Sequence, residues 1–278
     1  MVYCDSSGVT RSVTTPADLL SALKDSITSA IGKERTVAVA YSGGLDSSLI
    51  AKLAKESAEV KCYTCAMAGS FDADHALAFA AEDGLDLTMI VLGRESLAGL
   101  VARTGMLLNS DDPVRIAYTI PVICVLERCA ETTVLVGSGA DELFGGYAKY
   151  STATDPTAIM RSDLSKMLVE DNVLRMVAKA LGKRLESPYV SEVTLAFSAS
   201  LPVNLKISGN DRKVLLRKAA ASLGLLSHDR PKKAAQYSSG LMKEMKRQAG
   251  ISHVSLSDWV RQRTWCESDG STMHSQCP

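Results

Sequence analysis

Residues 36–48 read TVAVAYSGGLDSS, and this stretch decides the fold. Its first part, residues 37–41, is an unbroken apolar run, as expected for a parallel strand that is buried on both faces. The chain then turns through a serine and two glycines, and a helix is expected to begin near Asp46. Uncovered backbone amides at a glycine turn and the positive end of a helix dipole together favour an anion. We therefore predict a phosphate site at this turn.

Further apolar runs follow this strand and alternate with helical segments. The predicted strands are residues 60–67, 87–92 and 132–136, and the predicted helices are residues 15–32, 46–57, 70–80, 94–108 and 114–129. This alternation predicts an α/β fold with an open parallel sheet and helices on both faces. If the strand order is 3-2-1-4, the topological switch lies between the first and the fourth strand, where such sheets bind ligands.

The pattern changes to helices and loops beyond Tyr147, and we expect no further strand there. The predicted helices are residues 157–168, 172–181, 191–197, 211–223 and 239–248. We accordingly predict an α/β core with its N-terminal helix over residues 1–150, and a helical region over residues 151–250 that completes the active site. Residues 251–278 end in a serine-rich polar stretch and are predicted to be a mobile tail.

Composition describes a globular chain without a general affinity for polyanions. The 278 residues are 46% hydrophobic and carry a formal net charge of zero, which argues against a protein-wide attraction to nucleic acid or to a membrane. The sequence has no membrane span and no apolar signal segment, so we expect a cytoplasmic protein. One basic region that could face a polyphosphate contains Arg212, Lys213, Arg217, Lys218, Arg230, Lys232, Lys233, Lys243, Lys246 and Arg247.

A second glycine-punctuated turn follows the fourth predicted strand. Residues 137–147 read GSGADELFGGY, and the 3-2-1-4 order would place this turn and SGGLDSS on either side of one cleft. The SGGLDSS string resembles the pyrophosphate-binding loop of N-type ATP pyrophosphatases, which share an adenine nucleotide alpha hydrolase-like fold. Together with DELFGGY it resembles the synthetase domain of asparagine synthetase, over roughly Thr36 to Gly240.

The resemblance implies ATP and Mg²⁺ as cofactors and assigns roles to individual residues. The residues that would hold pyrophosphate are Ser42, Gly43, Gly44, Ser47 and Ser48. Asp46 and Asp141 would bind magnesium, a hard cation that prefers oxygen ligands and needs few from the protein when ATP supplies its own phosphate oxygens. The backbone of Gly137, Ser138 and Gly139 would lie near the nucleotide, and Glu142 would orient that loop.

A third stretch and several departures from the family pattern complete the resemblance. Residues 230–240 read RPKKAAQYSSG and are similar to the family's late basic motif, so Lys232 or Lys233 would contact the leaving pyrophosphate, with Lys233 favoured. The family's Glu-x-Arg before a Pro-aromatic pair is reversed here to Arg184-x-Glu186. Ser138 stands where the family commonly has Glu. The family's Thr/Arg segment before the helix at Pro121 has no clean match here, and Arg115 is the candidate substitute. These departures weaken any transfer of amino-acid specificity.

The resemblance implies activation of a carboxylate by ATP, with release of pyrophosphate and then amide formation. We see no glutaminase domain and no N-terminal cysteine nucleophile, so nitrogen is expected from ammonia, another amine or a separate glutaminase subunit. Two alternatives stay open: sulfur transfer to tRNA, and a non-catalytic nucleotide-binding subunit. Cys62 and Cys65 suggest sulfur chemistry, yet on a strand they would point to opposite faces, so we interpret them as buried structural thiols.

Overall fold

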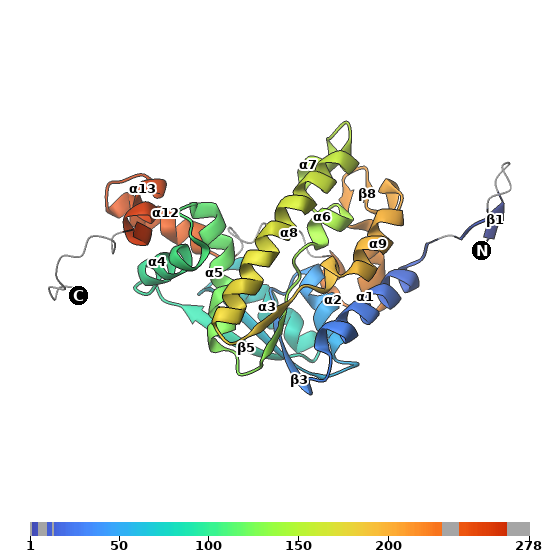
Figure 1. The fold of residues 1–278 in the computed structure, drawn as a ribbon, viewed down its shortest axis with the longest axis horizontal. Helices are drawn as coiled ribbons and strands as arrows, with labels where there is room; N and C mark the ends of the chain where they lie inside the picture. The colour runs from blue at the N-terminus through green and yellow to red at the C-terminus, as the bar shows by residue number, and fades with distance from the viewer. Residues whose placement is uncertain (1, 5–9, 13, 230–238, 266–278) are drawn as a thin grey trace.

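The centre of the molecule is a parallel sheet. The computed structural model describes residues 2–4, 10–12, 14–229 and 239–265, and its main sheet has five strands in the order β5-β4-β3-β6-β7 (Figure 1). These strands are β3 (Thr36–Ala40), β4 (Glu59–Met67), β5 (Asp86–Leu92), β6 (Thr133–Leu135) and β7 (Arg184–Glu186). The predicted order 3-2-1-4 is confirmed for the first four. The switch point therefore lies between β3 and β6, directly beyond the two glycine turns.

The fifth strand corrects the expectation that no strand follows Tyr147. β7 pairs in parallel with β6, with Leu185 opposite Val134. It has only three residues, of which the two outer ones are charged, so it carries neither an apolar run nor an alternating pattern. Because β7 joins the main sheet, the sheet extends across the domain boundary that we predicted at residue 150. Two short antiparallel pairs also occur: β1 (Val2–Cys4) with β2 (Thr10–Ser12), and β8 (Ile207–Ser208) with β9 (Asp211–Arg212).

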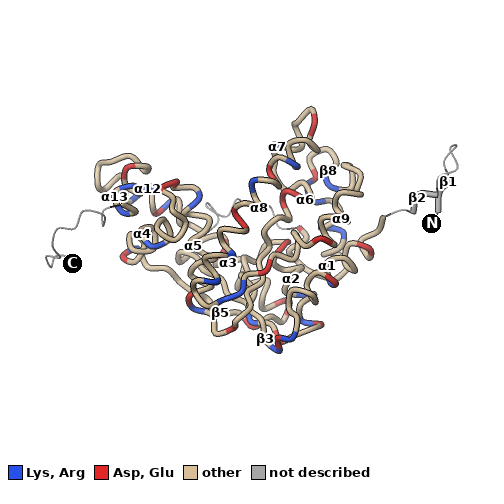
Figure 2. The backbone as a smooth tube through the Cα atoms, in the orientation of Figure 1, with Lys and Arg blue, Asp and Glu red and all other residues tan. Residues whose placement is uncertain are grey.

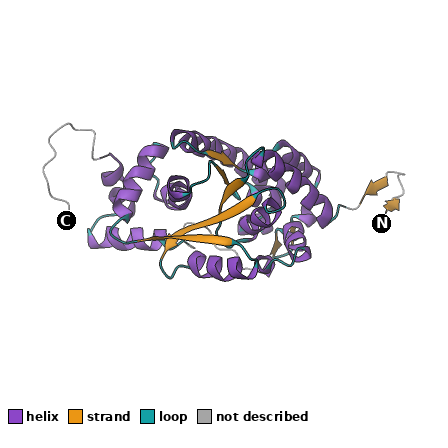
Figure 3. Cartoon of the chain, turned by 90° about the horizontal axis from the view of Figure 1, so that it is seen from below, coloured by secondary structure: helices purple, strands orange, loops and turns teal. Residues whose placement is uncertain are grey.

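Helices cover both faces of the sheet (Figure 3). Those up to the second glycine turn are α1 (Pro16–Ile31), α2 (Leu45–Ala54), α3 (Phe71–Glu82), α4 (Leu97–Leu108), α5 (Pro113–Arg128) and α6 (Ala140–Phe144). The later ones are α7 (Ala148–Ser151), α8 (Pro156–Ala180), η1 (Pro188–Val190), α9 (Glu192–Ser200), η2 (Val203–Leu205), α10 (Val214–Ser222), η3 (Leu226–Asp229), α12 (Leu241–Ile251) and α13 (Leu256–Trp265). The α/β fold class predicted from the sequence is thus confirmed.

The first helix shows how local sequence sets an element's ends. Thr15 and Asp18 form a capping box at the start of α1, in which each residue bonds the backbone amide of the other. Pro16 occupies the first turn, where its missing amide hydrogen costs nothing, and Gly32 ends the helix at φ 63°. Both ends match the prediction.

Alternate strand side chains enter two separate cores. Val37, Val39 and Cys62 face a core formed with α1, α2 and α10, whereas Ala38 and Cys65 face a core formed with α4, α5, α8, α12 and α13. This is the period of two that an extended strand imposes, here with apolar residues on both sides because both faces are covered. The two thiols of β4 therefore lie on opposite sides of the sheet, as predicted.

Two expectations for the second half of the chain are wrong: one helix was predicted as two, and one helix was predicted as a mobile tail. Residues 157–168 and 172–181 form one helix, α8, because the polar residues between them do not break it: the buried Asp171 accepts a hydrogen bond from Arg175 one turn later, at 2.7 Å. Part of the expected mobile tail is the helix α13, which packs against α4. Trp259 of α13 is fully buried, and a single indole in a polar stretch gave little periodic signal.

Charged residues of both signs are spread along the chain (Figure 2). Within the described residues, no helix is both long enough and apolar enough to span a membrane.

Leu49 of α2 offers a test of the core beneath the first glycine turn. Its side chain is fully buried among α1, α2 and the strands, so Leu49→Ala should lower the free energy of unfolding by about 2–5 kcal/mol, through lost burial and the cavity it leaves. Urea unfolding measures this change. Leu77→Ala is the matched control because Leu77 is 52% exposed, and it should change stability by less than about 0.5 kcal/mol. Equal losses in both variants would contradict the packing described.

Candidate active site

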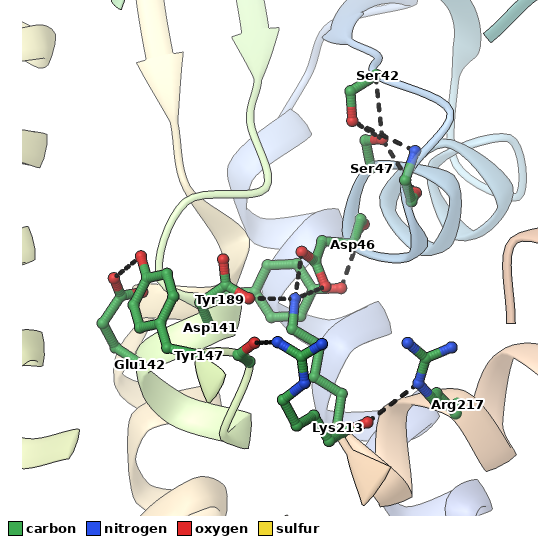
Figure 4. Close-up of polar contacts among 12 residues, drawn as sticks. Ser42, Asp46, Ser47, Asp141, Glu142, Tyr147, Tyr189, Lys213 and Arg217 are labelled. Atoms are coloured by element: carbon green, nitrogen blue, oxygen red, sulfur yellow. Dashed lines mark hydrogen bonds and ion pairs between the residues drawn. The ribbon is translucent and has the colours of Figure 1, made fainter. Parts of the chain in front are cut away.

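The first glycine turn connects β3 to α2 and holds its own side chains inward. Ser47 Oγ accepts the amide hydrogen of Ser42 at 3.2 Å, and Ser42 Oγ accepts that of Gly44 at 3.3 Å (Figure 4). Gly44 is the N-cap of α2 and brings no side-chain cap to it. The first amides of α2 are therefore not covered by a capping side chain, which is the arrangement that binds anions at helix N-termini.

Gly43 must be glycine for two independent reasons. Its φ is 63°, and a Cβ there would lie 2.9 Å from the backbone of Ala76 in α3. The turn is thus pressed against a neighbouring helix. Ser48 also belongs to this packing: it is fully buried, and its hydroxyl donates to Tyr41 Oη at 3.3 Å. The predicted role of Ser48 in holding pyrophosphate has no support from this contact.

The second glycine turn connects β6 to the short helix α6. Gly139 caps α6 at φ 91°, and Gly145 ends it at φ 75°, both in the left-handed region that glycine tolerates. Tyr147 Oη donates to Glu142 Oε1 at 2.8 Å. Burial, together with the nearby Asp141 and Glu142 carboxylates, raises the pKa of Tyr147 well above its ordinary value. The tyrosine therefore stays a hydrogen-bond donor to Glu142, and the orienting role of Glu142 stays a prediction.

A lysine joins the two turns. Lys213 Nζ lies 2.5 Å from Asp46 Oδ2 and 2.6 Å from Asp141 Oδ1, so one ammonium group contacts both carboxylates (Figure 4). The lysine side chain is only 4% exposed, against 23% and 21% for the two aspartates. Burial alone would lower the pKa of Lys213, but Asp141 and Asp46 outweigh it and the pKa is raised. The lysine therefore stays positively charged.

The backbone is shaped to let this lysine approach. Lys213 itself has φ 57°, an uncommon conformation for a residue with a side chain. A Cβ on Gly146 would lie 1.8 Å from Asp141 Oδ1 and 2.6 Å from Lys213 Cε. A Cβ on Gly137 would lie 3.2 Å from the Cβ of Asp46. Glycines in the second turn thus leave room for the charged groups. Tyr189, fully buried below them, donates from Oη to the carbonyl of Asp46 at 3.2 Å.

A cavity of about 640 Å³ opens beside the lysine and brings most of the predicted residues together. Those that line it are Ser42, Gly44, Asp46, Ser47, Gly137, Ser138, Gly139, Asp141 and Glu142. Gly43 and Ser48 do not line it and instead support the turn from behind. The cavity lies beyond the carboxyl ends of the neighbouring parallel strands β3 and β6, at the switch point that the topology predicts.

Sequence reasoning placed Lys213 only in a general basic region and missed its pairing. Arg212 and Arg217 of that region also line the cavity, and Arg212 donates to the carbonyl of Gly146 at 3.0 Å. Three cations thus reach the site from β9 and the start of α10. The signal available in the sequence was the cluster of basic residues between 212 and 218.

Lys232 and Lys233 lie outside the described residues, so their predicted contact with pyrophosphate stays a prediction. The end of the same motif is described. The carbonyl of Ser239 accepts the amide hydrogen of Met67 at 3.0 Å, at the end of β4. A Cβ on Gly240 would lie 3.1 Å from the Cβ of Met67. The motif therefore returns to the edge of the sheet that carries both glycine turns.

The reversed Arg184-x-Glu186 pair serves an internal ion network. Arg175 of α8 donates to Glu186 at 2.9 Å and to Asp171 at 2.7 Å, and Ser187 donates to the other oxygen of Asp171 at 2.5 Å. Asp171 lines the cavity with both oxygens engaged. Nearby, Arg115 is paired with Glu170 at 2.7 Å. This wall of the cavity is therefore built of charges that neutralise one another.

A glycine loop with open helix amides, and two carboxylates that meet beside it at the switch point of a parallel sheet, define an α/β protein of the nucleotide-binding class. The sequence matches the asparagine synthase family over residues 18–190, and the chain belongs to that family. The matched residues include both glycine turns and end before Lys213.

Known relatives carry the same family name. The chain is 29% identical to a putative glutamine-hydrolysing asparagine synthetase of Methanocaldococcus jannaschii, over 79% of this chain and 48% of the relative. It is 30% identical to an asparagine synthetase of Bacillus subtilis, over 55% of this chain and 25% of the relative. It is 34% identical to an asparagine synthetase domain-containing protein of Drosophila melanogaster, over 35% of this chain and 21% of the relative. The match thus spans about half the length of the first of these relatives and about a quarter or less of the other two.

Replacing Lys213 tests the bridge. Lys213→Met leaves two carboxylates facing each other without their cation, so the free energy of unfolding should fall by about 3–5 kcal/mol. Adding Asp141→Asn to this variant removes one of the repelling charges, and the double variant should lose less than the sum of the single losses. Urea unfolding measures both, with Lys218→Met as the control because Lys218 is exposed. Equal effects of Lys213→Met and Lys218→Met would contradict the bridge.

Gly146→Ala tests whether this glycine makes room for the bridge. The added methyl group meets Asp141 Oδ1 and Lys213 Cε, so one of them must move and the bridge must open. We expect the free energy of unfolding, measured with urea, to fall by about 1–3 kcal/mol, because the added methyl group overpacks the site. A Cβ on Gly99 in α4 meets nothing within 4 Å, so Gly99→Ala should not destabilise the protein. Equal stability of Gly146→Ala and the parent would show that the bridge tolerates the displacement.

Proposed function

We propose that the chain activates a carboxylate with ATP, releasing pyrophosphate, and then forms an amide from the activated acid. One observation carries the proposal: Asp46 and Asp141, from two neighbouring strand ends, converge on one cation beside an open glycine loop and a large cavity. Membership of the asparagine synthase family supports an ATP-dependent ligase of this general type.

The chain's own groups suit the first step. A carboxylate oxygen of the substrate attacks the α-phosphorus of ATP, the bond from that phosphorus to the bridging oxygen breaks, and pyrophosphate leaves with the electron pair. The open amides of α2 and the cations Arg212, Lys213 and Arg217 lie where they would stabilise the leaving charge. Positioning and charge stabilisation of this kind are the main contributions that a protein makes to phosphoryl and adenylyl transfer.

Asp46 and Asp141 fit a magnesium ion as well as a lysine. Their oxygens already approach a single positive centre at 2.5–2.6 Å, and carboxylates are the oxygen ligands that Mg²⁺ takes from proteins that bind nucleotides. When bound there, the ion would neutralise charge on the phosphates. Lys213 would then share the two carboxylates with the ion or turn toward the phosphates.

In the second step a nitrogen nucleophile attacks the acyl carbon of the adenylate, and AMP leaves with the electron pair of the acyl–oxygen bond. Aspartate and ammonia are the reference substrates, in keeping with the family. A separate glutaminase subunit is the other source of nitrogen. The cavity wall near Asp171 and Glu170 is internally neutralised, so a different carboxylate substrate is equally compatible with it.

The cysteines lend no support to the sulfur-transfer alternative. The four whose side chains are described, Cys62, Cys65, Cys124 and Cys129, are all buried. Burial raises the pKa of Cys62 to about 12, so its thiol stays protonated and is a poor nucleophile. Cys65 lines the cavity, but its hydrogen bond with Cys124 and its burial raise its pKa far above the ordinary value.

Pyrophosphate release tests the proposal. The assay contains ATP, Mg²⁺ and one of a panel of carboxylate substrates that includes aspartate and glutamate, each with and without ammonia. We expect pyrophosphate release to require one particular substrate of this panel. Asp46→Asn and Asp141→Asn should each lower the rate by roughly 100-fold or more, because each removes a carboxylate that holds the cation beside the leaving group. The exposed Asp25→Asn on α1 is the control and should retain the parent rate.

The outcome separates the remaining alternatives. Release without any carboxylate, or only with tRNA and a sulfur donor, would replace the proposed reaction. ATP binding without release across the whole panel would favour the non-catalytic nucleotide-binding subunit. Equal rates in the parent and in Asp46→Asn would remove the paired carboxylates from the mechanism altogether.

A further inference from the structure

A second, smaller cavity lies behind α6. Its volume is about 170 Å³, and Glu142 is the only residue that it shares with the large cavity, among the residues that the structure describes. Its apolar wall is formed by Leu143, Met160, Leu164, Leu195, Leu201 and Val203. It therefore lies between α6, α8, α9 and η2, at a distance from the glycine loop.

The amine of Lys206 lies in the wall of this cavity, beside polar as well as apolar side chains. Lys206 Nζ donates to Ser198 Oγ at 3.1 Å, and that hydroxyl in turn donates to the carbonyl of Leu143 at 2.9 Å. Within the described residues, no carboxylate lies within 4.0 Å of Lys206 Nζ. Burial accordingly lowers the pKa of Lys206 to about 8. Lys206 is half-buried, and a partly desolvated cation without a counter-ion favours a bound negative charge.

Lys213 provides the comparison within the same chain. Lys213 is buried and Lys206 is half-buried. Two carboxylates contact Lys213 and raise its pKa, whereas Lys206 donates to a neutral hydroxyl. The charged groups that line the small cavity are Lys206, Arg161 of α8 and Glu142 of α6. Glu142 accepts a hydrogen bond from Tyr147, which lines the large cavity. Among the described residues, neither Lys206 nor Arg161 forms an ion pair with a carboxylate.

We propose that the cavity around Lys206 and Arg161 binds a small aliphatic carboxylate. The carboxylate would meet the ammonium of Lys206 and the guanidinium of Arg161, and its short hydrocarbon chain would contact the apolar wall. A volume of about 170 Å³ suits a molecule of a few carbon atoms and is small for a nucleotide. A dianion such as phosphate fits less well, because it would need more donors and would face Glu142. The site does not depend on the proposed ATP reaction.

Butyrate is the probe, and butyramide is its neutral counterpart of the same shape. Calorimetric titration of the whole chain at pH 7 should show butyrate binding at least about tenfold more tightly than butyramide. Lys206→Met should lower butyrate affinity by about tenfold or more, and Arg161→Gln should also weaken it. Lys218→Met, which changes an exposed lysine, should bind butyrate as the parent does.

The pH dependence gives a second readout. Butyrate itself stays ionised from about pH 6 to about pH 9.5, because this range lies above the ordinary pKa of a carboxylic acid. Lys206 loses its charge as pH rises through its pKa of about 8. Butyrate affinity should therefore be constant below that pH and should fall by up to about tenfold per pH unit above it. In Lys206→Met the affinity should not change with pH.

Several results would overturn the proposal. Equal binding of butyrate and butyramide would mean an apolar cavity without a carboxylate site. Loss of butyrate binding in Asp46→Asn but not in Lys206→Met would place the carboxylate in the large cavity. Binding of inorganic phosphate, but not butyrate, at Lys206 would assign a different anion. Lys206→Met should unfold at the same or a higher urea concentration than the parent, because it removes a half-buried amine that has no counter-ion. A misfolded variant is thereby recognised, and Arg161→Gln then carries the test.

Discussion

The contact of one lysine with two aspartates is the constraint on which the rest of the site depends. Lys213 is buried, and a buried ammonium is tolerated only when carboxylates compensate for its lost hydration. Asp46 lies in the first turn of α2, Asp141 lies in the first turn of α6, and Lys213 precedes α10, so the bridge ties together three segments that are distant in sequence. The site requires β3 and β6 to lie side by side, because the turns that follow these two strands place both aspartates.

The bridge explains backbone features that would otherwise be strained without reason. Lys213 takes a left-handed conformation, and such a conformation persists only where the surroundings hold it. Gly146 lies against Asp141 and Lys213, so this glycine is required by close approach and not by its own turn geometry. Gly43, by contrast, is required both by its positive φ and by the packing of the first turn against α3. Glycines that look equivalent in the two motifs therefore serve different physical purposes.

Much of this was predictable because the evidence was local. Apolar runs gave β3, β4, β5 and β6, and glycine turns after two of them located the cleft. β7 was not predictable, since three residues with charged ends carry no period and the strand exists only because β6 offers an edge. The sequence did not show that α8 is a single helix, because Asp171 looked like a polar break between two helices. In the structure Asp171 lies inside the helix and is paired with Arg175. Lys213 was seen only as part of a basic cluster, because its partner Asp46 is 167 positions away.

Lys213, which is buried, and Lys206, which is half-buried, show that desolvation by itself does not determine the state of an amine. Desolvation acts on Lys206 and on Lys213 in the same direction, toward the neutral form. In Lys213 two carboxylates reverse the effect, and the charge becomes a structural link. In Lys206 a single hydroxyl does not, so the charge stays only weakly held and depends on what enters the adjoining cavity. Glu142 borders both cavities and directly follows Asp141, so one short helix, α6, contributes a residue to the wall of the small cavity and one of the two aspartates that contact Lys213.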